Sequence, residues 1–117
     1  MSKYLCRETI LNANDIKTEE VNVPEWGGVV LVKSLTGSEK DKYEQSIYSI
    51  KDGANYNNIR AKFVALSICD EDLKPIFGSA DIEALGQKSA IALNRVFEVA
   101  QKLSGLTSAD VEELEKN

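Results

Sequence analysis

The sequence contains no histidine. Histidine is the commonest general base and the commonest metal ligand in proteins, so its absence removes Ser–His and Cys–His nucleophile pairs. The two cysteines, Cys6 and Cys69, are far apart and fit no metal-binding or redox spacing. No signal peptide is recognisable, so we expect a cytosolic setting in which both cysteines are reduced thiols of the core.

Long apolar runs and excess positive charge are lacking as well. The longest apolar run, residues 63–69, is interrupted by Ser67 and is much shorter than the roughly 20 residues of a membrane-spanning helix. The formal net charge of −5 argues against a nucleic-acid backbone as partner. With 117 residues, of which 43% are hydrophobic and 28% charged, the chain is typical of one globular domain.

What the sequence does contain is a β-hairpin pattern at residues 20–35. Polar and apolar residues alternate over residues 20–23, as in a half-buried strand. Pro24 ends this strand because proline has no N–H to donate to a sheet, and two glycines after the single tryptophan permit a turn. Residues 29–35 then read as a second strand. An isolated hairpin is not stable in water, so we expect helices to cover its apolar face.

Side-chain alternation divides the second strand into two faces. One face carries Val30, Val32 and Ser34, and the other carries Val29, Leu31 and Lys33.

Helical periodicity and capping patterns account for most of the remaining chain. They predict helices over residues 3–12, 36–52, 59–69, 79–85 and 87–104, with a last short helix over residues 111–115. Thr36 and Glu39 form a capping-box pattern. Ser79 is the expected cap of its helix, and Gly105 is the expected stop after the longest one.

Apolar residues mark the inner faces of these helices. Tyr43, Ile47 and Ile50 share one face of the second helix, and the helix over residues 59–69 is apolar on two sides. Such a helix is usually sandwiched between layers, so we expect it to be the most buried, with the hairpin on one side and other helices on the second. A core face on residues 87–104 comprises Leu93, Val96, Phe97, Val99, Ala100 and Leu103.

The predicted fold class is therefore α+β, a mostly helical single domain over residues 1–117 with an N-terminal β-hairpin packed on helices. We expect the folded core to span residues 1–105, followed by an acidic C-terminal tail or short helix over residues 106–117.

Two motifs have simple structural explanations. Asp70, Glu71 and Asp72 could suggest a cation site, but Lys74 and Pro75 stand where an EF-hand loop requires an oxygen ligand and a glycine. A solvated acidic turn, from which Ile76 and Phe77 return to the core, explains them better. Residues 36–38, followed by Lys40 and Lys42, lack the first glycine and the Gly-Lys-Ser/Thr ending of a phosphate loop, and helix capping accounts for them. We predict no catalytic residue, no cofactor and no metal site.

Exposed apolar residues are the best candidates for a binding surface. Trp26 at the hairpin tip is either a plug on the core or an anchor at an interface, where tryptophan is enriched. Ile91 lies among polar residues on the outer side of the longest helix. Together with Val29 and Leu31, these residues are our candidate surface for a partner or for self-association into a homo-oligomer. The hairpin edge is also suited to strand addition.

Several stretches of this sequence resemble one known family. They are Val21-Asn-Val-Pro-Glu-Trp-Gly-Gly-Val-Val-Leu-Val-Lys-Ser-Leu-Thr-Gly37, then Ala61-Lys-Phe-Val-Ala-Leu-Ser-Ile-Cys-Asp70, Lys74-Pro-Ile-Phe77 and Asp81-Ile-Glu-Ala-Leu85. The chain thereby resembles the tail assembly chaperones of long-tailed, non-contractile bacteriophages and prophages. The likeness covers residues 4–117, and Val-Pro-Glu-Trp-Gly is its most specific part.

This resemblance implies a non-enzymatic role. It implies binding to the tape measure protein while tail tube protein polymerises around it, in the cytoplasm of the bacterial host. It also implies absence from the mature virion. In this family some ribosomes shift frame near the end of the gene, so the resemblance further implies a longer product that shares this N-terminal module.

Three other functions compete with this hypothesis. A structural head–tail connector or minor tail component would be a permanent part of the particle. A metal-dependent hydrolase would have to use the acidic turn. A transcription regulator would need a basic recognition helix, whereas only Arg60 and Lys62 begin the otherwise apolar helix over residues 59–69.

Overall fold

The hairpin forms where the alternation predicts it. In the computed structural model, which describes residues 3–48 and 58–105, β1 (Thr18–Val23) pairs antiparallel with β2 (Gly28–Lys33). Val21 stands opposite Val30. A 3-10 turn, η1 (Pro24–Trp26), connects the strands, and Gly27 closes it with a left-handed φ of 78°.

A short third strand extends this sheet. β3 (Ile68–Cys69) pairs with β2 and gives the strand order β1-β2-β3. The sequence analysis placed these two residues in the preceding helix, which is wrong, because α3 (Ile59–Ser67) ends at Ser67. The Ser67 hydroxyl donates to the Phe63 carbonyl oxygen at 2.8 Å, and Ile68 turns to an extended conformation with ψ of 127°.

The remaining helices follow the predicted order with different ends. They are α1 (Arg7–Leu11), α2 (Gly37–Tyr48), the 3-10 turn η3 (Ser79–Asp81), α4 (Ile82–Gly86) and α5 (Ala90–Leu103). The predicted capping box of α2 is confirmed: Glu39 N donates to Thr36 Oγ1 at 3.1 Å and Thr36 N donates to Glu39 Oε1 at 2.9 Å. Gly105 stops α5 with a φ of 74°.

Two helix starts differ from the prediction. α5 begins three residues later than predicted, because the Ser89 hydroxyl caps it by accepting from Ala92 N at 3.4 Å. Ser79 does not cap its helix. Instead, the Asp81 carboxylate accepts a hydrogen bond from Gly78 N at 2.8 Å. The acidic side chain thus reaches back three residues to the start of the turn.

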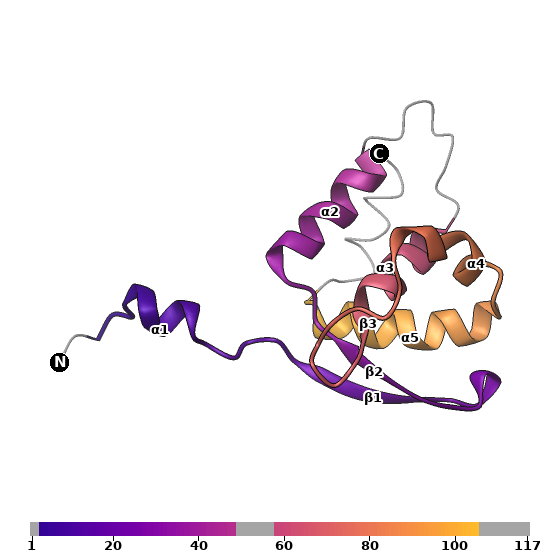
Figure 1. Ribbon diagram of the computed structural model, residues 1–117, viewed down its shortest axis with the longest axis horizontal. Coiled ribbons are helices and arrows are strands. Elements are labelled where there is room, and N and C mark those ends of the chain that lie inside the picture. Colours follow the sequence, from indigo (N-terminus) through magenta and orange to yellow (C-terminus); the bar gives the residue numbers. More distant parts are fainter. Residues whose placement is uncertain (1–2, 49–57, 106–117) are drawn as a thin grey trace.

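The molecule is layered, with α5 on the sheet and α3 beyond α5 (Figure 1). α5 is therefore the main helix on the hairpin, whereas the sequence analysis gave that place to α3. α3 contacts α5, α4, α2 and β3. Six of its nine residues are buried, the largest share of any described helix, which confirms the prediction that it is the most buried.

Aromatic side chains join the helices in the core. Phe63 lies edge-to-face with Tyr43, at 5.0 Å between ring centroids, and with Phe97 at 5.5 Å. Val21, Val23 and Val32 of the sheet belong to the same buried cluster. The fold is thus α+β, a mostly helical domain with an N-terminal hairpin packed on helices.

Three residue-level predictions need correction or completion. Both cysteines are free, but only Cys69 is a core thiol; Cys6 is exposed because α1 has no buried residue. The predicted helix over residues 3–12 shortens to α1 for the same reason.

Phe77 packs against the core as predicted, whereas Ile76 is exposed. The Ile47 side chain, Ile50, the predicted helix end at 52 and the segment 106–117 lie outside the described residues.

Candidate partner-binding surface

The outer face of the hairpin carries exposed aliphatic side chains. Val29 and Leu31 alternate with Val30 and Val32, and the buried residues of β1 and β2 face α5. Val29 and Leu31 therefore lie on the opposite side of the sheet. Val29 is 58% exposed and Leu31 is half-buried. This face can contact an apolar partner without any change in the core.

Trp26 ends η1 at the hairpin tip. The side chain is half-buried and packs against the core cluster. Part of it therefore contributes to the core, and part remains accessible to solvent. Both readings of this residue, as a core plug and as an interface anchor, are compatible with that position.

A bidentate ion pair fixes the hairpin tip to α5. Arg95 donates through Nη1 to Glu25 Oε1, and through Nη2 to Glu25 Oε2 at 3.1 Å. Hydrogen bonding to Arg95 lowers the pKa of the Glu25 carboxyl below its usual range and raises the pKa of Arg95. The pair sets the position of η1 and Trp26 relative to α5.

Ile91 lies one helical turn before Arg95 and is 68% exposed, as predicted. It therefore neighbours the hairpin tip, on the helix that covers the inner face of the sheet. The structure brings Ile91 toward the tip that carries Trp26 but leaves Val29 and Leu31 on the far side of the sheet. The four candidate residues thus form two surfaces that share the tip.

Lys33 is a residue whose role the sequence analysis missed. It was placed on the same strand face as Val29 and Leu31, with no further role; its side chain is only 3% exposed and pairs with Glu39 of α2. Its ammonium group also lies 3.4 Å from the Ser34 carbonyl oxygen. The pair ties β2 to the first turn of α2. A lysine shortly before a capping-box glutamate was the available signal.

The edge strand β1 offers a second mode of contact. β2 is the middle strand, so the outer edge of β1 pairs with no other strand among the described residues. Thr18, Glu19 and Glu20 at its start are exposed. An extended peptide could add to this edge through main-chain hydrogen bonds.

The acidic turn is explained by its own backbone. Asp70 Oδ1 accepts hydrogen bonds from Asp72 N at 2.8 Å and from Lys74 N at 3.0 Å. Across residues 3–48 and 58–105, no group of three acidic or cysteine side chains could hold a metal ion. Within the same residues, no helix combines the length and apolar character needed to cross a membrane.

Comparison with known proteins identifies the family. Residues 6–117 match the family model described as phage tail assembly chaperone. The chain belongs to the phage tail assembly chaperone family. The structure of the bacteriophage HK97 tail assembly chaperone is similar, with a TM-score of 0.57 and 20% sequence identity over 82% of this chain and 94% of that one. This second likeness supports the fold. No curated protein matches the chain.

Proposed function

We propose that this tail assembly chaperone acts without catalysis by binding the tape measure protein during tail assembly, together with tail tube protein. The observation that carries this proposal is the family match over residues 6–117. The proposed place of action is the cytoplasm of the bacterial host, and the finished virion should lack the protein. A small acidic domain suits this role because it can keep a long amphipathic client in solution.

The proposed contact surface comprises Trp26, Val29, Leu31 and Ile91. Exposed aliphatic side chains on both sides of the hairpin support it, because apolar contact area drives most protein association. The tip between them is held by the Glu25–Arg95 pair. The same surface can serve self-association of this chain.

A pull-down with a tape measure fragment tests the surface. We expect Val29→Glu and Ile91→Glu each to weaken capture of the fragment, since a charge placed in an apolar contact must be desolvated. Ile10→Glu is the matched control, because Ile10 is also an exposed isoleucine but lies in α1. Equal capture by all variants would show that the contact lies elsewhere. Light scattering of the wild type beside Trp26→Ala and Ile91→Glu tests self-association in the same way.

Mass spectrometry of purified virions separates the chaperone from a connector or minor tail component. We expect this protein in infected cells and its absence from the particles. A stoichiometric amount in the particles would favour the structural alternative. The neighbouring genes give independent support if a very long helical reading frame follows this one.

A further inference from the structure

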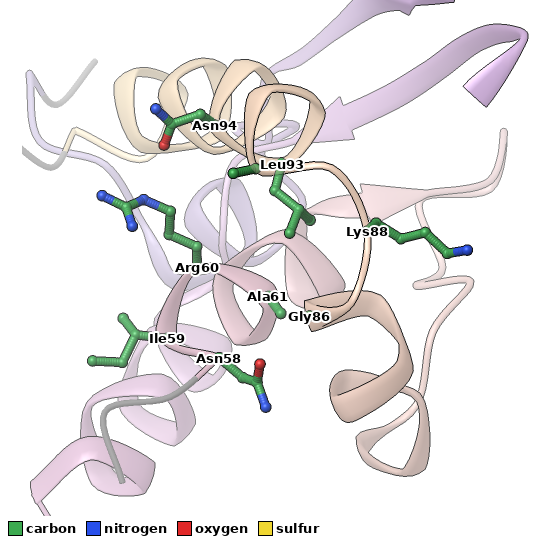
Figure 2. A pocket seen from close by; sticks show the side chains of 9 residues that line it. Asn58, Ile59, Arg60, Ala61, Gly86, Lys88, Leu93 and Asn94 are labelled. Atoms are coloured by element: carbon green, nitrogen blue, oxygen red, sulfur yellow. The ribbon is translucent and has the colours of Figure 1, made fainter. Parts of the chain in front are cut away.

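A pocket of about 600 Å³ lies where three helices meet. The start of α3, the end of α4 and the start of α5 form its walls (Figure 2). The lining includes the apolar side chains of Ile59 and Leu93, both of which are almost fully buried. Asn58 and Asn94 add amide groups to the lining.

Two cations flank this pocket. Figure 2 shows Arg60 and Lys88 on opposite sides of the opening, with Leu93 between them. Both side chains are exposed, and neither forms an ion pair with any residue that the structure describes. The Arg60 guanidinium lies 5.6 Å from the centroid of the Phe97 ring, which favours a defined position for the charge.

The described lining of the pocket carries two positive charges although the protein is acidic overall. Among the described residues, no aspartate or glutamate lines the pocket, and neither α3 nor α5 has an acidic residue in its first turn. The whole chain nevertheless has a formal net charge of −5. Cations left without acidic neighbours in such a chain attract negatively charged groups from a partner.

Asn58 and Gly86 lie close together in the pocket lining. Asn58 has a left-handed φ of 68°, and its Oδ1 lies 2.0 Å from where a Cβ at position 86 would stand. Only glycine at position 86 leaves the amide in place. A Cβ at position 86 would therefore displace the Asn58 amide from its place beside α4.

We propose that this pocket binds an acidic, amphipathic segment of a partner protein. Carboxylates of the segment accept hydrogen bonds from Arg60 and Lys88, and an aliphatic side chain between them packs on Leu93. The placement of the two cations on opposite sides favours a segment lying across the opening over a single small anion. This site is separate from the outer hairpin face and does not depend on the client proposed above.

A fluorescently labelled amphipathic helical peptide of leucine and glutamate residues is the probe. We expect the wild type to bind it, and a matched peptide with glutamine for every glutamate to bind far more weakly. The double variant Arg60→Gln/Lys88→Gln should weaken binding about tenfold or more in anisotropy titrations, because both charge-assisted contacts are lost.

The control is Lys17→Gln/Lys74→Gln, which removes two positive charges from exposed lysines outside the pocket. It should retain nearly wild-type affinity, and unchanged thermal unfolding should show that both double variants are folded. If both double variants lose the same peptide affinity, the loss comes from the overall charge of the protein, and the proposal is overturned. Binding that appears only after the acidic residues of segment 106–117 are neutralised would make that segment the occupant, which also overturns it.

Discussion

Phe63 connects the layers of the domain at the level of a single side chain. Its ring is fully buried and lies edge-to-face with Tyr43 of α2 and with Phe97 of α5. One aromatic cluster therefore joins three helices. Edge-to-face pairs of this kind add to the free energy gained by burial alone. Packing at this position therefore holds α2 and α5 together through α3.

Truncating this ring should be costly. We expect Phe63→Ala to lower the free energy of unfolding by roughly 3–5 kcal/mol, because the removed ring leaves a cavity between three helices. Urea unfolding followed by circular dichroism measures the change. Phe77→Ala, at a half-buried ring, should cost less. A loss below about 1 kcal/mol at Phe63 would contradict its place in the core.

The Glu25–Arg95 pair predicts a pH dependence. Because the folded-state pKa of Glu25 is lowered, its contribution to stability is complete above the unfolded value of about 4.3 and is lost as pH falls through the folded pKa. Glu25→Gln should therefore be less stable than the wild type at neutral pH, and the difference should vanish at lower pH. Urea titrations across this pH range test it.

Glu71→Gln is the control for this measurement, since Glu71 is exposed and forms no ion pair within the described part of the chain. If the stability difference between wild type and Glu25→Gln stays the same as the pH falls, the charge of Glu25 does not contribute to stability.

At the scale of elements, the start of α2 combines two functions in one carboxylate. Glu39 completes the capping box with Thr36 and also neutralises the buried Lys33 of β2. The helix start and the strand end are thus fixed to one another. Exposed ion pairs contribute little to stability, but removing one partner of a buried pair leaves an uncompensated charge.

Glu39→Gln separates the two functions, because glutamine keeps an oxygen that can accept from Thr36 N. We expect this variant to lose roughly 3 kcal/mol of stability, at the low end for breaking a buried pair. The double variant Lys33→Met/Glu39→Gln should recover much of the loss, as no buried charge then remains. Thermal and urea unfolding of the three proteins measures both effects. A double variant as unstable as Glu39→Gln would show that the charge of Lys33 is not the cause.

Elements with local signals could be predicted from the sequence. Alternation at residues 20–23, the Thr36–Glu39 spacing and the glycine at 105 each act within a few residues, and each produced the expected feature. β3 could not be predicted, because a two-residue strand exists only through its pairing with Leu31 and Val32. The exposure of Val29 and Ile91 followed from periodicity. The sheet separates Val29 from Ile91, and one pocket has both Arg60 and Lys88 in its lining. Both arrangements depend on how distant elements pack.

At the scale of the whole molecule, contacts are unevenly distributed. The sheet and the helices from α2 onward share one buried core, while α1 contributes no buried residue and lies away from it (Figure 1). Tyr4, Leu5, Ile10 and Leu11 are all exposed. Such a short helix without tertiary packing is marginal in water.

The isolation of α1 has a consequence for proteolysis. Trypsin requires a locally unfolded backbone around its target, so accessibility of a basic side chain is not sufficient. We expect limited trypsin digestion to cut after Arg7 before it cuts after Lys102, because unfolding α1 exposes no core residue. Lys102 is also exposed but lies in α5, whose unfolding disrupts the core, and it should resist. Mass spectrometry of the fragments at early time points gives the order of cleavage. If Arg7 is protected as long as Lys102, α1 must be covered in solution, and another molecule would then shield Ile10 and Leu11 from the enzyme.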